Sequence, residues 1–383
     1  MAAISEKIHD DTSDNTTMSG KNKESRFCIS FKTMKNGSNR SPAIHSKPNQ
    51  DSFFAWFKDC DVVEEDHLES PTPFGAFGVI DGHGSELNLG GILSIIASRY
   101  MNLEIPKRWV EINHNPMKEV YKLFSDLNEL LFMKVHEILL EKKYNVEIIN
   151  KTIHNGTERK YLQYSNKGSK CIKKCSGGCT ASITFILENG IIISGHVGDS
   201  DTYIFKNDIT IPLFEKHSPE SILERARIIR EYGNEYVSFV YDTSDRLSRP
   251  PIFNTTTNSV IDPKILFNQG HSLYFKNVSG EFATMISTPD YELNLAMTRS
   301  LGDFYIGAYG CSSEPTIIQS KLDSDIQIVC ASDGIWDNWK IEDFREFLYT
   351  TNFEETFEKS VELAKNNFGR SHDDMTLLEF RFI

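Results

Sequence analysis

The sequence predicts an α+β protein whose strands and helices form separate layers. Two helical segments stand together near residues 89–140, and two more stand together near residues 341–368. The segments with strand character come in runs between these pairs and are joined by short turns. Helices in pairs and strands in meanders are typical of layered α+β folds, whereas a parallel α/β sheet requires strands and helices that alternate.

The first part of the chain contains three predicted strands followed by two helices. Residues 27–34, 51–57 and 74–80 are short runs rich in aromatic and β-branched side chains, which favour strands. Residues 89–101 carry apolar side chains at helical spacing, and residues 117–140 form a long amphipathic helix. The apolar stripe of this second helix consists of Val120, Leu123, Leu127, Leu130, Leu131, Val135 and Ile138.

The second half of the chain adds more strands and a second pair of helices. Residues 181–187 and 191–198 flank the turn Glu188-Asn189-Gly190, and this pattern predicts a hairpin. Two further strands, at residues 202–205 and 209–214, are expected to extend the same sheet. The remaining predicted elements are a buried strand, two helices and a last strand, at residues 326–331, 341–349, 354–368 and 375–382.

Three segments lack this regular pattern. Residues 1–24 are polar and without periodicity, so they predict a disordered tail in front of a single domain that spans residues 25–383. Residues 241–290 contain several Pro, Asn and Gly and predict a long, partly irregular insertion, of the kind that is often functional. Residues 144–175 predict a second and more disordered insertion.

Composition narrows the partners and the compartment that we expect. The formal net charge of −13 argues against nucleic acid or an anionic membrane as the main partner. No segment has the roughly 20 apolar residues that a membrane-spanning helix needs. Cys171, Cys175 and Cys179 recur at every fourth position, which is not the usual spacing of a structural zinc site, so we expect reduced cysteines and a cytoplasmic or nuclear location.

Five aspartates stand at or near the ends of predicted strands. Asp81, Asp199 and Asp333 follow strands directly or within two residues, Asp51 begins a strand, and Asp373 precedes one. Taken singly, an aspartate at a strand end is usually a solvated or turn-forming residue. Taken together, the five place carboxylates on loops that a layered β structure can bring to one rim.

Clustered carboxylates repel one another unless cations neutralise them. A site made of oxygen atoms without Cys or His suits hard cations such as Mg²⁺ or Mn²⁺. Gly82, next to Asp81, lets the backbone approach closely enough for its carbonyl to act as a further ligand. The sequence therefore predicts a magnesium or manganese centre at this rim.

The motifs that contain these residues resemble those of the metal-dependent, type 2C family of protein serine/threonine phosphatases. They occur in the family order between about residue 26 and residue 383. The resemblance implies a four-layer αββα sandwich, with two antiparallel sheets flanked by helix pairs and a metal centre at one edge. The matching stretches are "NQDSFF", "FGVIDGHGS", "GGCTASITFI", "GHVGDSDTYIF", "KHSPE", "LAMTRSLGDF", "VCASDGIWDNW" and "SHDDMTLLEF".

The resemblance also implies a role for each aspartate at a centre that holds two Mg²⁺ or Mn²⁺ ions. Asp81 would bridge the ions, and Gly82 would bind one of them through its carbonyl. Asp333 and Asp373 would bind the other ion, while Asp51 would act on the first ion mostly through water. Asp199 matches a residue that serves a third, weaker ion in some relatives, although it fits a hairpin-turn cap equally well.

The implied reaction is direct attack of a metal-bridging hydroxide on phosphoserine or phosphothreonine in protein substrates, without a phospho-enzyme intermediate. His83 would donate a proton to the leaving oxygen, the alternative being a core histidine that supports the loop. Asp303 and Arg299 match positions of the family that are structural. A monomer that acts in signalling is expected.

The sequence departs from the family at the residue that binds the phosphate group of the substrate. Many relatives have an Arg five residues before the equivalent of Asp51, where this chain has Ser46. We expect Lys47 to take over part of this role with lower phosphate affinity, because Lys lacks the bidentate fork of Arg; replacing Lys47 with Ala should then raise KM for a phosphopeptide. Two other functions fit the same motifs, a pseudophosphatase that only binds and a phosphatase of small phosphorylated metabolites.

Overall fold

The computed structural model describes residues 27–35, 49–58, 61–63, 67–69, 73–84, 86–245, 249–288, 293–323, 326–369 and 372–382. The predicted disordered tail at residues 1–24 and the predicted phosphate-binding residue Lys47 lie outside these ranges.

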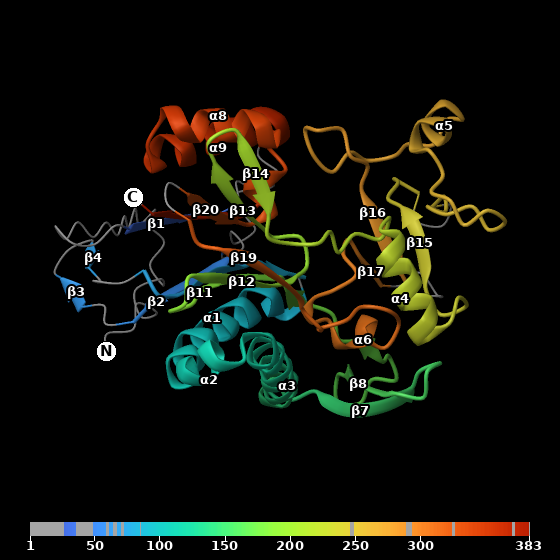
Figure 1. Cartoon of the computed structure of the whole chain (residues 1–383). Coiled ribbons are helices and arrows are strands. Elements are labelled where there is room, and N and C mark those ends of the chain that lie inside the picture. Colours follow the sequence, from blue (N-terminus) through green and yellow to red (C-terminus); the bar gives the residue numbers. More distant parts are fainter. Residues whose placement is uncertain are drawn as a thin grey trace.

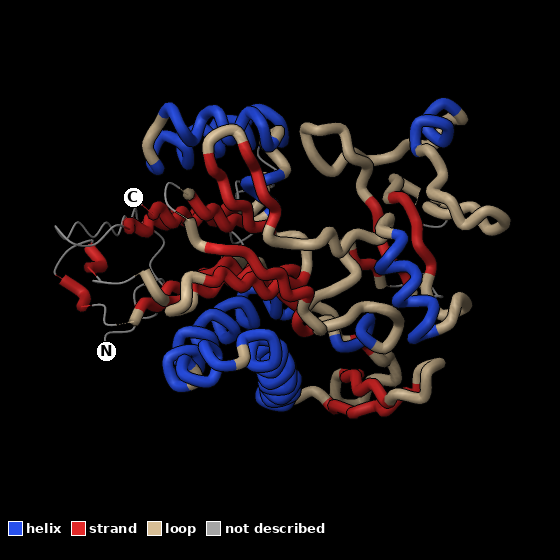
Figure 2. Tube along the Cα trace, viewed as in Figure 1, coloured by secondary structure: helices blue, strands red, loops and turns tan. Residues whose placement is uncertain are grey.

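Two five-stranded antiparallel sheets lie face to face at the centre of the molecule, and helices cover the outer side of each (Figures 1 and 2). This arrangement confirms the predicted four-layer sandwich. The order of the first sheet is β19 (Thr316–Lys321), β12 (Ile191–Val197), β11 (Ala181–Ile186), β5 (Gly75–Ile80) and β2 (Ser52–Phe57). The order of the second sheet is β1 (Phe27–Met34), β21 (Met375–Phe382), β20 (Gln327–Ala331), β13 (Asp201–Lys206) and β14 (Ile209–Pro212).

The helical layers enclose apolar cores on the outer side of each sheet. The first sheet is covered by α1 (Leu89–Lys107), α2 (Trp109–His114) and α3 (Pro116–Glu141). The second is covered by α7 (Asp333–Trp336), α8 (Ile341–Thr350) and α9 (Phe353–Phe368). None of the helices within the described ranges has both the length and the apolar composition needed to cross a membrane.

A third apolar core fills the space between the two sheets. Phe77 of β5 stacks on Phe380 of β21 with ring centroids 5.8 Å apart, and Phe57 of β2 stacks on the same ring at 6.0 Å. All three side chains are buried. Because these rings come from facing sheets, their burial fixes the two sheets against each other and so fixes the edge where the strand ends meet.

The expectation that the strands after β12 extend the same sheet is wrong. Both β13 and β14 belong to the second sheet, where β13 pairs with β20. The chain changes sheets at Gly198, whose φ of +96° is unfavourable for residues with a side chain. The hydroxyls of Ser182 and Thr202 then lie 2.8 Å apart and link the two sheets. Local alternation of apolar residues predicts a strand but does not say which sheet the strand joins.

The expectation of disorder at residues 144–175 is also wrong. β7 (Asn145–Thr152) and β8 (Glu158–Ser165) form a hairpin to which β9 (Lys173–Lys174) adds a short third strand. Tyr161 of β8 is buried with its ring 5.0 Å from the ring of Tyr305. Aromatic and β-branched residues such as Ile149, Tyr161 and Tyr164 favour strands, and the charged residues between them do not prevent the hairpin.

A side lobe, residues 222–297, lies beside the sandwich (Figure 1). It has an apolar core of its own that contains Ile228, Tyr232 and Ile286. Of the described residues between β15 and β16, only the six of α5 form a helix or strand. This insertion is therefore largely irregular, as predicted. The elements of the lobe are α4 (Ile222–Tyr232), β15 (Ser238–Tyr241), α5 (Pro263–Asn268), β16 (Thr284–Ser287) and β17 (Asn294–Leu295).

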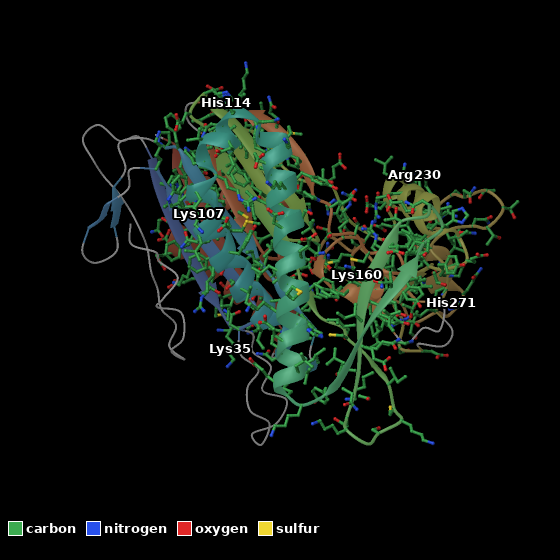
Figure 3. The ribbon with its side chains drawn as sticks, turned by 90° about the horizontal axis from the view of Figure 1, so that it is seen from below. Lys35, Lys107, His114, Lys160, Arg230 and His271 are labelled. Atoms are coloured by element: carbon green, nitrogen blue, oxygen red, sulfur yellow. The ribbon has the colours of Figure 1, made fainter. Side chains whose placement is uncertain are left out.

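Seen from below, the sandwich and the lobe are distinct halves of the molecule (Figure 3). Lys107 and His114 lie on the half that contains the sandwich, whereas Lys160 of β8, Arg230 and His271 lie on the half that contains the lobe. The remaining described elements are β3 (Asp61–Val63), β4 (His67–Glu69), β6 (Gly82–His83), the short η2 (Glu86–Asn88), β10 (Gly178–Cys179), β18 (Leu301–Gly302) and α6 (Phe304–Gly307).

Candidate active site

The strand ends bring the five predicted aspartates to one edge of the sandwich. Asp81 follows β5, Asp199 follows β12 after one residue, and Asp333 begins α7 just after β20. Asp51 precedes β2, and Asp373 precedes β21 by one residue. Burial raises the pKa of Asp81 well above its usual value, and the charges of the other four aspartates raise it further. The five carboxylates therefore share one electrostatic environment.

Asp51 is held in a buried loop beside this cluster. Its Oδ2 accepts a hydrogen bond from the Ser332 hydroxyl at 2.8 Å, while its buried Oδ1 has no hydrogen-bond partner within the described ranges. Burial and then the charge of Asp374 raise the pKa of Asp51 well above its usual value. Asp374 in turn accepts a hydrogen bond from the backbone N–H of Gln50 at 2.8 Å, so this additional carboxylate also positions the Asp51 loop.

The donor set fits hard divalent cations. No three His, Cys, Asp or Glu side chains of the described residues converge closely enough to hold a metal ion as they stand. The orphaned Oδ1 of Asp51 nevertheless needs an electrostatic partner, because a buried polar atom without one costs about 1–3 kcal/mol or more. Burial and the charges of Asp199 and Asp373 raise the pKa of Asp333 to about 7. Cations at this edge would relieve that repulsion.

Glycines let the backbone pass closely around these aspartates. A Cβ atom on Gly82 would lie 2.3 Å from the carbonyl oxygen of Gly90, and a Cβ on Gly334 would lie 1.9 Å from that of Asp374. Both distances are far below contact, so the loops of Asp81 and Asp333 require glycine. The carbonyl of Gly82 stays a predicted metal ligand.

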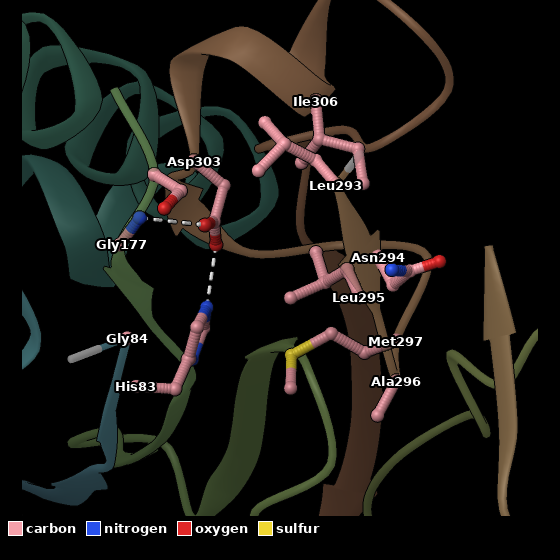
Figure 4. A pocket seen from close by; sticks show the side chains of 11 residues that line it. His83, Gly84, Gly177, Leu293, Asn294, Leu295, Ala296, Met297, Asp303 and Ile306 are labelled. Carbon is pink, nitrogen blue, oxygen red and sulfur yellow. Dashed lines mark hydrogen bonds and ion pairs between the residues drawn. The ribbon is translucent and has the colours of Figure 1, made fainter. Parts of the chain in front are cut away.

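His83 lies beside the aspartates in a small three-stranded sheet made of β6, β10 and β18. Its Nε2 is 2.5 Å from Oδ2 of Asp303, and the Gly177 N–H donates to Oδ1 of the same carboxylate at 3.2 Å (Figure 4). The Ser300 hydroxyl also donates to Oδ2, at 2.6 Å. Burial lowers the pKa of His83, but the charge and hydrogen bond of Asp303 outweigh it, so that the pKa is raised. The structure thus gives Asp303 an orienting role that the sequence did not indicate.

A cavity of about 270 Å³ opens beside this pair. His83 and Asp303 line one side, and the apolar side chains of Leu295, Met297 and Ile306 line the other (Figure 4). Leu295 and Met297 belong to the side lobe, so the lobe and the sandwich form this cavity together. A substrate side chain can therefore meet an imidazole and an apolar wall at the same place.

Two charged residues near the cluster were missed by sequence reasoning. Lys276 of the side lobe places its Nζ 2.8 Å from Oδ2 of Asp199. Burial raises the pKa of Asp199, but the charge and hydrogen bond of Lys276 lower it by more, so the net shift is downward. Asp337 caps the C-terminal end of α7, one helical turn after Asp333, and that spacing was the signal available in the sequence. No local pattern marks Lys276, which is 77 residues from Asp199.

Comparison with known proteins gives consistent matches. The sequence model of protein phosphatase 2C matches residues 122–351, more than half of the chain. A probable protein phosphatase 2C 2 of Paramecium tetraurelia is 23% identical over 177 residues, which are 45% of this chain and 48% of that protein. The match therefore spans about half the length of that relative.

Solved structures were compared with this chain over most of its length. The crystal structure of serine-threonine phosphatase 2C from Toxoplasma gondii has a TM-score of 0.55 at 15% identity and covers 96% of this chain and 98% of its own. The serine/threonine phosphatase of Mycobacterium tuberculosis has a TM-score of 0.45 at 11% identity and covers 93% of this chain and 98% of its own. The first likeness shows that the two chains have the same fold.

Proposed function

The chain belongs to the protein phosphatase 2C family, and on that premise we propose that it hydrolyses phosphoserine and phosphothreonine in proteins with the help of divalent metal ions. The observation that carries the proposal is the position of five aspartates at strand ends along one edge of the sandwich, where the charges of the other four act on Asp81. These carboxylates lie beside the hydrogen-bonded pair of His83 and Asp303, which supplies a group able to transfer a proton.

The proposed centre holds two Mg²⁺ or Mn²⁺ ions. Asp81, Asp333, Asp373 and the carbonyl of Gly82 would bind them, with Asp51 acting through water. When bound, two such ions would ionise a water molecule and neutralise charge on the phosphoryl oxygens. Buried carboxylates that repel one another in the protein alone are suited to this task, because each bound cation removes part of their repulsion.

The proposed role of His83 is to protonate the leaving oxygen of the serine or threonine. Its Nε2 donates to Asp303, whose own pKa is lowered because His83, Ser300 and Gly177 together outweigh the effect of burial. This bond fixes the imidazole ring and favours its protonated form. Nδ1 would then carry the second proton, and because no described residue accepts a hydrogen bond from it, this is the proton that His83 would transfer.

We also propose that the substrates are phosphoproteins of the cytoplasm or nucleus and that the chain acts as a monomer. Cys171, Cys179, Cys311 and Cys330 form no disulfide, as suits a reducing compartment. Fractionation of cells that express the tagged chain checks the location, and the sedimentation coefficient of the purified chain checks the monomer.

The test of this function is phosphate release from a phosphothreonine peptide with Mn²⁺ and with chelator. We expect turnover that requires Mn²⁺ and that falls by at least about 100-fold in Asp81→Asn, because a preorganised charge at the reacting group contributes that much. Asp208→Asn, which alters an exposed turn away from the cluster, is the matched control and should keep full activity. Turnover that persists in chelator, or that survives Asp81→Asn, would reject the proposal.

A further inference from the structure

The side lobe reaches the aspartate cluster through a narrow hairpin, residues 275–282, which we call the lobe tip. The rings of Phe275 and Phe282 stack at its base with centroids 4.5 Å apart. The backbone N–H of Lys276 donates to the carbonyl of Glu281 at 2.7 Å, and that of Gly280 donates to the carbonyl of Asn277 at 3.1 Å. These bonds give the lobe tip a defined shape and set the direction in which Lys276 points.

Two contacts join the lobe tip to the sandwich edge. The Nζ of Lys276 lies 2.8 Å from Oδ2 of Asp199, in the turn after β12. The N–H of Val278 donates to the carbonyl of Asp337 at 3.0 Å, at the end of α7. Since Asp337 also donates its own N–H to the carbonyl of Asp333, the lobe tip is connected to the helix that begins with a predicted metal ligand.

The Lys276 ammonium contacts one carboxylate and interacts electrostatically with two more. Asp199 pairs with this ammonium directly. The positive charge of Lys276 also lowers the pKa values of Asp333 and Asp337, although burial and neighbouring carboxylates keep both pKa values above the usual one. The Lys276 side chain is 28% exposed and that of Asp199 is 18% exposed, so the pair is partly shielded from water. A carboxylate cluster of this kind attracts a cation, and here the protein supplies the cation itself.

We propose that Lys276 occupies the place of a third divalent ion, so that the protein binds two exchangeable ions and uses a lysine of its own side lobe as the third positive charge. The inference rests on the proposed two-ion centre. Its consequence is regulatory, because the lobe tip is then held against the site at any metal concentration rather than only when a third ion is present. Asp199 accordingly serves as the partner of Lys276 and not as a metal ligand in the wild-type protein.

The first experiment counts bound Mn²⁺ per chain from the electron paramagnetic resonance signal of the free ion during titration. We expect two ions in the wild type and a third, weaker ion in Lys276→Met, whose side chain has similar length without charge. Lys276→Arg, which keeps the charge, should bind two. Lys216→Met is the matched control, because Lys216 pairs with Glu281 of the same lobe tip without contacting the aspartates.

The second experiment measures tryptic cleavage after Lys276 in the full-length protein. Trypsin has to bind the ammonium that Asp199 holds, so Asp199→Asn should increase the rate of cleavage at this bond by at least tenfold over the wild type. A wild type that binds three Mn²⁺ ions, a Lys276→Met variant that binds no more ions than the wild type, or unchanged cleavage in Asp199→Asn would each overturn the inference.

The two proposals fail in different ways. A wild type that binds two Mn²⁺ ions but releases no phosphate from the phosphothreonine peptide would reject the proposed catalytic function and leave the role of Lys276 standing. A wild type that hydrolyses the peptide while binding three Mn²⁺ ions would reject the role of Lys276 and leave the catalytic function standing.

Discussion

Glu224 is the centre of a buried ion-pair network that joins α4 to the segment before β18. Its carboxylate accepts hydrogen bonds from the Arg299 guanidinium at 2.6 Å, the Arg227 guanidinium at 3.0 Å and the Thr298 hydroxyl at 2.7 Å. Only 6% of its side chain is exposed. Burial raises the pKa of Glu224, but the hydrogen bonds and charges of Arg299 and Arg227 outweigh burial and lower it to about 2.

This shift sets the size of the expected effect. The ordinary pKa of Glu224 is 4.5 and the folded value is about 2. Each pKa unit corresponds to about 1.4 kcal/mol, so the ionised form contributes about 3 kcal/mol of folding free energy. The folded pKa is the depressed one, so this contribution is present above pH 4.5 and is lost as the pH falls toward 2. Glu224→Gln imitates the protonated form and should lower the free energy of unfolding at pH 7 by about 3 kcal/mol.

Urea unfolding followed by circular dichroism measures this difference. The gap between the wild type and Glu224→Gln should be widest at neutral pH and should narrow as the pH falls from 4.5 toward 2. Glu235→Gln, at an exposed position close by, is the matched control and should be neutral. If Glu224→Gln lowers the free energy of unfolding by less than about 1 kcal/mol at pH 7, or if the difference from the wild type does not depend on pH, the network does not stabilise the fold as an ion pair.

Two further changes test the loops around the site. Asp303→Asn should lower kcat for the phosphopeptide by about 100-fold with little change in KM, because His83, the proposed proton donor, loses the charge that holds it protonated. An unchanged kcat would remove His83 from the proposed mechanism. Gly334→Ala should weaken Mn²⁺ binding, because the added Cβ would lie 1.9 Å from the carbonyl oxygen of Asp374. Gly307→Ala is the control and should leave Mn²⁺ binding unchanged, because a Cβ at Gly307 would have no atom within 4 Å. Equal Mn²⁺ affinity in these two variants would contradict the tight packing at Gly334.

The sandwich was expected from the resemblance of several motifs to a known family, and each of these motifs is a local signal. The motifs around Asp81 and Asp333 each combine a buried strand, an aspartate and a glycine within a few residues. The pairing of β13 with the second sheet was not predictable in this way, because it depends on a turn at Gly198 and on partners more than 120 residues away. The β7–β8 hairpin was missed because charged residues stand between its apolar side chains and neither strand alternates strictly between buried and exposed residues.

The contacts that complete the candidate site depend on positions far apart in sequence. His83 and Asp303 are 220 residues apart, and Asp199 and Lys276 are 77 residues apart. Either aspartate alone has an ordinary structural interpretation as a turn residue. Only the folded chain shows that one of them orients an imidazole and that the other binds a lysine, which is why the sequence could name these residues without giving these roles.

The side lobe contributes to the site at two places, and both lie outside the residues that form the sandwich. Leu295 and Met297 provide the apolar wall opposite His83, and Lys276 pairs with Asp199. The lobe has a core of its own, so its internal packing does not depend on the core between the two sheets. Its tip meets the aspartate edge through polar contacts of Lys276 and Val278, and such contacts are easier to change than a packed core. If the proposed function holds, substitutions in the lobe should therefore alter which phosphorylated segments reach the site while the aspartate edge stays as it is.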